Sequence, residues 1–117
     1  MPYDPNNVFA RILRDEIPST RVYEDDEFIA FRDINPAAPT HILVIPRHHG
    51  VAGPADLTEA DADWVGRMMV VAARIAAEQG LNASGYRLLF NNGADAGQEV
   101  PHLHLHILGG KRLSTLA

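Results

Sequence analysis

Three of the six histidines of this chain lie within five residues near its C-terminal end, in the segment Pro-His-Leu-His-Leu-His-Ile-Leu-Gly at 101–109. Successive side chains of a strand point to opposite faces, so this spacing predicts that His102, His104 and His106 share one face. The apolar residues between and after them are expected on the core side: Leu103, Leu105 and Ile107. Buried imidazoles carry a desolvation cost and add little packing, so the pattern indicates a chemical role.

A metal-dependent hydrolase is one interpretation of this face. Imidazole is the commonest protein ligand of metal ions, and three histidines that leave an open position suit a hydrolytic zinc. Residues two apart in a strand lie about 7 Å apart at the backbone, whereas zinc–nitrogen bonds are about 2 Å long. Three rings on one strand therefore need curvature and a helper such as His41 to converge on one ion.

Transfer at phosphorus is a second interpretation, and it suits a row of separated rings. One neutral imidazole attacks phosphorus, a neighbour donates a proton, and the others bind phosphate oxygens. Mutual repulsion among nearby histidines resists their joint protonation, which keeps a lone pair available near neutral pH. The residue types alone leave this interpretation and the metal site nearly equal, and a solvated polar strand face is a third alternative.

The composition favours one globular domain over residues 1–117, because 46% of the 117 residues are hydrophobic and 21% are charged. A net charge of −5 argues against a nucleic-acid partner, whose phosphates need a broad basic surface. Cysteine is absent, which excludes disulfides and thiolate chemistry and fits a reducing compartment. No apolar segment has the length to span a bilayer, so we expect a cytoplasmic protein without a membrane partner.

Helix and strand signals along the chain predict an α+β fold, with two helices packed on a mainly antiparallel sheet of five strands. Helices are expected over 8–15 and from about Thr58 to Gly80, and strands over 20–23, 28–31, 41–45, 86–90 and 101–109. Trp64 and two methionines lie in the long helix. Either part of the apolar surface of that helix faces a second subunit, or all of it belongs to the core.

The histidine segment follows the pattern His-φ-His-φ-His-φ-φ, with φ apolar, and it resembles the defining motif of the histidine triad (HIT) superfamily. Other segments are similar to the Hint branch of that superfamily: Glu16-Ile17-Pro18, Tyr23-Glu24-Asp25-Asp26, Ala30-Phe31-Arg32-Asp33-Ile34, Ala38-Pro39-Thr40-His41, Val44-Ile45-Pro46, the Asn91 loop and Gly109-Gly110. The resemblance extends from about Val8 to Lys111, which is nearly the whole chain.

The resemblance implies a HIT-like fold that forms a homodimer through the long helix and a strand, joining two sheets into one of ten strands. It implies hydrolysis of the P–N bond of purine nucleoside 5′-phosphoramidates of the AMP-lysine type, through a covalent nucleotidyl-histidine and without a metal or other cofactor. Purine nucleoside monophosphates would bind as well. The alternatives are a dinucleoside polyphosphate hydrolase or nucleotidyltransferase of the same superfamily, a His-liganded metal hydrolase, and a nucleotide-binding module without turnover.

Site residues are also implied by the resemblance. His104 would be the nucleophile, His106 and His102 would orient it and bind phosphate, and His41 would support it from the adjoining strand. The nucleotide-binding residues would be Phe9, Ile12, Phe31 and Ile34 around the purine, Asp33 at the ribose hydroxyls, and Asn91, Gly97, Glu99 and Val100 near the α-phosphate.

Two departures from the Hint pattern concern the leaving group. Glu99 stands where animal-type relatives usually have serine, and a carboxylate there either attracts an amine leaving group or points to solvent. The sequence also ends at Ala117 without the tryptophan-bearing tail of some relatives, so its leaving-group preference is expected to differ from theirs. His48 and His49, which follow Pro46-Arg47, are expected to be ordinary surface histidines.

Overall fold

The computed structural model describes residues 1–115, and Leu116 and Ala117 lie outside the described residues. The elements are α1 (Val8–Leu13), β1 (Arg21–Glu24), β2 (Phe28–Arg32), β3 (Thr40–Pro46), α2 (Ala62–Glu78), β4 (Tyr86–Leu89) and β5 (Leu105–Gly109). Three short 3₁₀ turns accompany them: η1 (Pro54–Asp56), η2 (Glu59–Asp61) and η3 (Ala94–Ala96). The predicted α+β class is confirmed.

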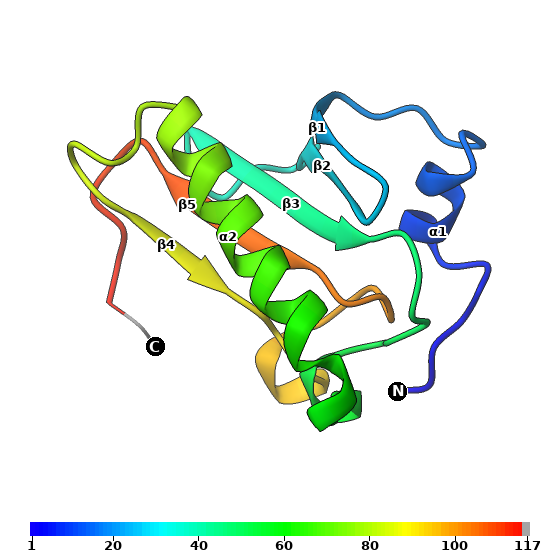
Figure 1. Ribbon diagram of the computed structural model, residues 1–117. Coiled ribbons are helices and arrows are strands. Elements are labelled where there is room, and N and C mark those ends of the chain that lie inside the picture. Colours follow the sequence, from blue (N-terminus) through cyan, green and yellow to red (C-terminus); the bar gives the residue numbers. More distant parts are fainter. Residues whose placement is uncertain (116–117) are drawn as a thin grey trace.

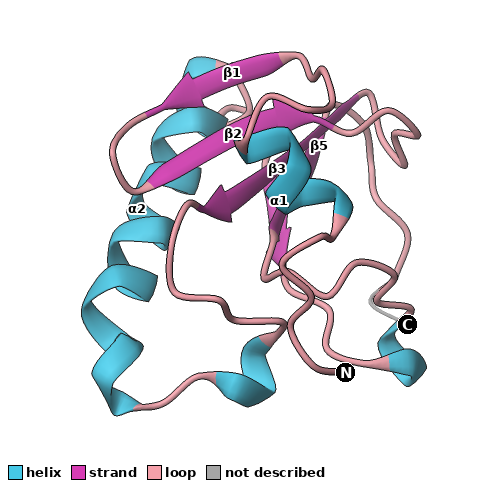
Figure 2. Cartoon of the chain, turned by 90° about the vertical axis from the view of Figure 1, so that its right-hand side faces the viewer, coloured by secondary structure: helices cyan, strands magenta, loops and turns pink. Residues whose placement is uncertain are grey.

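The five strands form one sheet in the order β1-β2-β3-β5-β4, and every neighbouring pair is antiparallel. The long helix α2 crosses one face of this sheet, whereas the short helix α1 lies against the other face (Figures 1 and 2). The segment that carries the histidines, β5, is therefore an interior strand, with β3 on one side and β4 at the sheet edge on the other.

Alternate strand residues feed two separate cores. Phe28 and Ala30 of β2 join the larger core beneath α2, together with Met68 and Ile75 of the helix. The residues between them face the other way and form a smaller core with α1: Phe9, Ile12, Ile29, Phe31, Leu43 and Ile45. Because α1 has only six residues, it covers the part of its face formed by β2 and β3, and the neighbouring part formed by β5 is left for polar side chains.

The predicted last strand over 101–109 is wrong in its first half, because the ladder begins only at Leu105. Pro101 has no backbone N–H to give to a neighbouring strand. The next two N–H groups bond elsewhere, that of His102 to the Val100 carbonyl at 2.9 Å and that of Leu103 to the Val51 carbonyl at 2.8 Å. Two of the three histidines thus lie in irregular backbone rather than in a regular strand.

The helices also differ from the prediction at their ends. The first ends at Leu13, because Asp15 adopts a left-handed backbone with φ of 60°. Thr58 caps the turn η2 rather than α2, through a capping box with Asp61, and α2 starts after that turn. Within residues 1–115, no helix combines the length and apolar character needed to cross a bilayer.

Candidate active site

A pocket of about 210 Å³ opens on the α1 face of the sheet, beside β5. Register places His106 of β5 directly opposite Leu43 of β3, so both side chains leave the sheet on this face. The pocket is lined by Phe9, Asp33, Leu43, Asn91, Gly97, Gln98, Glu99, Val100, His104 and His106. These ten residues are called the histidine pocket below, and eight of them were predicted as site residues.

His104 presents a free lone pair to the histidine pocket. Its Nδ1 lies 2.6 Å from the backbone carbonyl of His102, and a carbonyl only accepts, so Nδ1 carries the proton. The lone pair of the neutral ring is therefore on Nε2. Burial lowers the pKa of His104, against the opposing effects of the His102 carbonyl and of Asp33, so the ring is neutral near pH 7.

A chain of hydrogen bonds fixes the opposite orientation in His106. The backbone N–H of Ala37 donates to Nδ1 of His41 at 3.0 Å, which leaves the His41 proton on Nε2. That Nε2 donates to Nδ1 of His106 at 2.9 Å. His106 therefore carries its proton on Nε2, a buried atom with no hydrogen-bond partner among residues 1–115. An unpartnered buried N–H at a pocket wall is a ready donor for a ligand oxygen or nitrogen.

The surroundings of the two hydrogen-bonded rings, His41 and His106, keep both rings neutral. Burial lowers the pKa of His41, although Asp33 opposes the shift. Burial and the neighbouring His104 and His41 lower the pKa of His106 to about 4. Asp33 acts against this shift, because its negative charge raises the pKa of His106. A bound anion would act in the same direction as Asp33, so this ring gains proton affinity when a phosphate enters.

His102 lies apart from the histidine pocket and has a different environment. Its Nε2 donates to the Pro46 carbonyl at 3.1 Å, and its Nδ1 faces the side chains of Asn7 and Tyr3 at 3.2 and 3.3 Å. The side chain is 2% exposed, and burial lowers its pKa to about 4. Its backbone carbonyl, rather than its ring, is the part that contacts His104.

Asp33 and Glu99 bring two carboxylates to the histidine pocket. One oxygen of Asp33 accepts the backbone N–H of Asn35 at 2.8 Å, and the other lies 3.5 Å from Nε2 of His41. Glu99 is exposed, and no ion pair involving it occurs within residues 1–115. Asp33 is therefore held by the loop after β2, whereas Glu99 is free to meet a ligand.

The four residues predicted around the purine occupy three different environments. Phe9 lines the histidine pocket and packs edge-on against His104, with ring centroids 4.9 Å apart. Ile12 and Phe31 lie in the smaller core behind it. Ile34 is 88% exposed and does not line the pocket. An aromatic wall is thus built at Phe9 alone, with the other two buried residues supporting it.

The loop between β4 and β5 forms the wall opposite Asp33. Gly97 adopts φ of 75°, a left-handed conformation that favours glycine. Gln98 was missed as a site residue by the sequence reasoning. Its buried amide donates to the carbonyls of Ala52 and Val100 and accepts the N–H of Gly93, which fixes the loop against the segment before η1. A lone glutamine in a glycine loop gives no signal of this role. Leu43, which also lines the pocket, was missed too, because only the sheet register shows that it lies opposite His106.

The three triad rings do not converge on one point, and among residues 1–115 no three His, Cys, Asp or Glu side chains cluster as a metal site would require. Both nitrogens of the His102 ring are engaged by protein partners, Nε2 by the Pro46 carbonyl and Nδ1 by Asn7 and Tyr3, so this ring has no nitrogen left for an ion. His48 and His49 are exposed, as predicted, and His49 stacks on Trp64. The residues do not fit a triad-bound metal ion.

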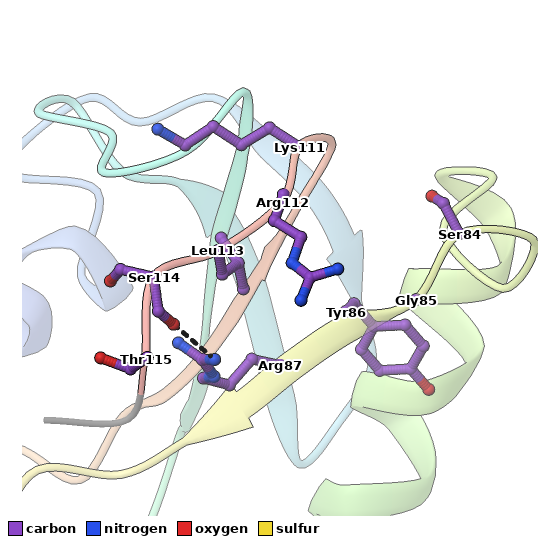
Figure 3. Close-up of a pocket in the computed structure, with 9 residues that line it drawn as sticks. All are labelled: Ser84, Gly85, Tyr86, Arg87, Lys111, Arg112, Leu113, Ser114 and Thr115. Atoms are coloured by element: carbon purple, nitrogen blue, oxygen red, sulfur yellow. Dashed lines mark hydrogen bonds between the residues drawn. The ribbon is translucent and has the colours of Figure 1, made fainter.

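A larger hollow of about 660 Å³ lies at the edge formed by β4 and the C-terminal segment. It is lined by Ser84, Gly85, Tyr86, Arg87, Lys111, Arg112, Leu113, Ser114 and Thr115, with no histidine or carboxylate among them. Figure 3 shows the Arg87 guanidinium directed at the Ser114 carbonyl, 3.1 Å away, and Lys111 pointing away from the other cations. This hollow lacks a nucleophile with an adjacent base, so the histidine pocket is the candidate active site.

Comparisons with known proteins identify the relatives of this chain. The HIT domain family model matches residues 14–113. A HIT-like protein of Azospirillum brasilense is 48% identical over 97% of this chain and 93% of its own length. The purine nucleoside phosphoramidase of Escherichia coli is 47% identical over 93% of this chain and 91% of its own. A HIT family hydrolase from Legionella pneumophila superimposes with a TM-score of 0.89 at 44% identity, covering 93% of this chain and 96% of that one.

The α+β fold, the pocket with its paired imidazoles and these relatives together assign the protein to the class of nucleotide-binding hydrolases. The chain belongs to the histidine triad (HIT) domain family, which confirms the resemblance drawn from its sequence.

Proposed function

We propose that this protein hydrolyses the P–N bond of purine nucleoside 5′-phosphoramidates and that His104 carries the nucleotidyl group between the two half-reactions. One observation carries the proposal. The 2.6 Å bond from Nδ1 of His104 to the His102 carbonyl leaves a lone pair on Nε2 in a pocket where His106 holds a proton on its own Nε2. A nucleophile and a donor therefore stand side by side, with ring centroids 4.9 Å apart.

In the first half-reaction, the Nε2 lone pair of His104 attacks the α-phosphorus as the bond from phosphorus to the amine nitrogen breaks. Binding of the anionic substrate raises the proton affinity of the His41–His106 pair, which takes up one proton from solvent and releases it again after the second half-reaction. The departing nitrogen takes a proton from Nε2 of His106, the amine leaves neutral, and the pair is again neutral. The hydrogen bond between His41 and Nδ1 of His106 holds the ring in place during this transfer. Positioned proton donors of this kind contribute about 10²-fold to 10⁴-fold.

In the second half-reaction, water attacks the same phosphorus and the bond to Nε2 of His104 breaks. The proton of the water returns to His106, and the nucleoside monophosphate leaves with the added oxygen. Water is the only co-reactant, and both histidines end in the protonation states in which they began. Two displacements through a covalent histidine replace one difficult attack of water on the phosphoramidate.

The volume of the histidine pocket suits part of a nucleotide rather than the whole of it. Its volume of about 210 Å³ is below the about 300–1,000 Å³ that drug-sized ligands usually occupy. The pocket therefore encloses the phosphate and ribose, with Asp33 accepting from the ribose hydroxyls, while the base extends along Phe9 toward exposed Ile34. The purine nucleoside phosphoramidase name of the E. coli relative favours this substrate class over a dinucleoside polyphosphate.

The implied homodimer is part of the proposal. The edge strand β4 has one side of its backbone unpaired within the described sheet, and Met69 of α2 is 39% exposed. Pairing of β4 with its copy would extend the sheet and cover this part of the helix. Sedimentation analysis is expected to give twice the chain mass, and Met69→Glu is expected to shift the protein toward monomer. A monomeric wild-type protein at micromolar concentration would refute the dimer. The cytoplasmic location stays a prediction.

Turnover of AMP-lysine, quenched in alkaline denaturant because the P–N bond of a nucleotidyl-histidine hydrolyses in acid, is followed by mass spectrometry of the peptides and tests the covalent step. Wild-type protein is expected to carry an AMP adduct on the peptide that contains His104. The His104→Ala protein should carry none and lose turnover, whereas His48→Ala should behave as wild type. EDTA treatment separates the proposal from a metal-dependent reaction, because full activity is expected in its presence. Turnover without any adduct would rule out the covalent route.

A further inference from the structure

The side chain of Asn7 connects helix α1 to the histidine segment through a buried ring. Its Oδ1 accepts the backbone N–H of Ala10 at 2.9 Å and thereby caps α1. Its Nδ2 donates to the Asp4 carbonyl at 2.7 Å and faces Nδ1 of His102 at 3.2 Å. A backbone N–H only donates and a carbonyl only accepts, so the amide can take only this orientation.

The orientation of Asn7 decides which nitrogen of His102 bears the proton. The amide presents its second N–H to Nδ1 of His102, and the Tyr3 hydroxyl lies 3.3 Å from the same atom. At the other end of the ring, Nε2 meets the Pro46 carbonyl, which only accepts. His102 is therefore held neutral, with its proton on Nε2, by donors at one end and an acceptor at the other.

The same residue then orients the nucleophile. The backbone carbonyl of His102 accepts the Nδ1 proton of His104, and this bond is what leaves Nε2 of His104 free. The segment lies outside the β5 ladder, and two anchors hold that carbonyl in place. The Leu103 N–H of the same peptide group donates to the Val51 carbonyl, and the His102 ring is bonded at both ends. Asn7 is 5% exposed and does not line the histidine pocket. Its influence on a substrate must therefore pass through other groups, either the His102 ring and carbonyl or helix α1 with Phe9.

We infer that Asn7 is a positioning residue for His104, acting through the His102 ring and its carbonyl, and that Tyr3 assists it. The inference deepens the proposed function and rests on it for its kinetic consequences. The Asn7 amide holds two parts of the site in place. Its oxygen caps the helix that brings Phe9 against the His104 ring, and its nitrogen orients the ring of His102. A change of this amide should therefore alter the chemical step more than it alters substrate binding.

Two variants of Asn7 separate this role from helix capping. Asn7→Asp keeps an accepting oxygen for the cap but turns a carboxylate oxygen toward Nδ1 of His102, so the ring is expected to take up a proton there. Asn7→Thr also keeps a capping oxygen, but its shorter side chain has no amide N–H to reach the ring. Asn6→Asp is the matched control, since it makes the same chemical change one residue earlier at an exposed position.

Two readouts distinguish positioning from stability. With AMP-lysine as substrate, Asn7→Asp is expected to lower kcat by about 10-fold to 100-fold with little change in KM, since a misplacement of about 1 Å can cost on the order of 10²-fold. Long-range ¹H–¹⁵N NMR of the free protein is expected to show His102 protonated only on Nε2 in wild type and on both nitrogens in Asn7→Asp. Asn7→Thr should lower kcat without that second proton, and Asn6→Asp should match wild type.

Wild-type kcat together with an unchanged His102 spectrum in folded Asn7→Asp would overturn the inference. If neither Asn7 variant folds, the wild-type spectrum still decides, because a proton on Nδ1 of His102 would contradict the donors assigned to Asn7 and Tyr3. Tyr3→Phe adds a milder test, with a kcat loss of a few-fold expected and none if the hydroxyl is idle. The NMR result is independent of turnover, so an absent His104 adduct would refute the proposed function without deciding this inference.

Discussion

Nε2 of His41 lies 2.9 Å from Nδ1 of His106, and this contact sets the proton position in both rings. The two residues lie on adjacent antiparallel strands, β3 and β5, and face each other diagonally, because His41 pairs with Leu108 and His106 pairs with Leu43. Sheet register alone brings the rings together. The Ala37 N–H at the far side of His41 then leaves only one arrangement of protons along the pair.

His41 should therefore affect catalysis without contacting the substrate. His41→Ala removes the donor to His106 and leaves the backbone N–H of Ala37 without its acceptor, so kcat is expected to fall about 10²-fold. His41→Gln places an amide near the former Nε2 and should recover part of this loss. Steady-state kinetics with AMP-lysine measure both variants. Equal activity of His41→Ala and wild type would show that the hydrogen-bond chain is unimportant for turnover.

His106 is expected to matter in proportion to the basicity of the leaving group. His106→Ala should slow hydrolysis of an alkylamine phosphoramidate of AMP by about 10²-fold to 10⁴-fold, because the amine cannot leave without a proton. The p-nitroanilide phosphoramidate of AMP releases a weakly basic amine, so its hydrolysis should be slowed far less by the same change. Burst and steady-state rates for the two substrates give the comparison. The same loss for both would show that His106 is not the proton donor.

Glu99 should select for positive charge on the leaving group. AMP joined to cadaverine and AMP joined to pentylamine form a matched pair, since they differ only in a terminal ammonium. Glu99→Gln is expected to reduce the preference for the cadaverine compound by about 2-fold to 5-fold, the range of an exposed ion pair worth about 0.5–1 kcal/mol. The ratio of the two kcat/KM values is the measurement. An unchanged ratio would indicate that the carboxylate points to solvent.

The buried histidines should make stability depend on pH below neutrality. Burial lowers the pKa of His102 from 6.5 to about 4, so the unfolded chain binds the proton more readily than the native protein. Stability then increases with pH across that window. The neutral His102 ring makes its full contribution to the free energy of unfolding above about pH 6.5. As the pH falls to about 4, the protein loses roughly 3 kcal/mol of stability from this ring.

Urea denaturation at pH 7.0 and pH 4.5 measures this loss. His102→Gln removes the titrating group and should reduce the difference in unfolding free energy between the two pH values. The exposed His49 serves as the control, because His49→Gln should leave the difference as in wild type. A wild-type protein that is equally stable at both pH values would contradict the pKa assigned to buried His102.

The sheet and the position of the histidine segment could be predicted from sequence, because both depend on local patterns. Apolar runs rich in β-branched and aromatic residues predicted β2 and β3, and the His-Leu-His-Leu-His spacing identified the histidine segment. The start of β5 could not be read this way. The alternation continues through Pro101, and what ends the ladder is the bonding of two N–H groups to Val100 and Val51. One of those partners is some fifty positions away in the chain, beyond the reach of periodicity.

The site residues were recoverable where the family motif is specific and not where tertiary contacts decide. His104, His106 and Asp33 all line the pocket as expected. Ile12 and Phe31 are core residues that support Phe9 from behind rather than lining the pocket. The role of Asn7 could not be predicted, because nothing in the sequence shows that its second amide hydrogen meets a ring 95 positions later.

The length of α1 has a consequence for substrate size. The helix has two turns at most, and Leu43 of β3 and His106 of β5, which it leaves uncovered, line the catalytic cavity. Cavity depth is therefore controlled by a peripheral segment that bears no strand. Grafting a longer or bulkier N-terminal segment onto the unchanged sheet should narrow the range of nucleotides accepted, while the reacting imidazoles keep their spacing.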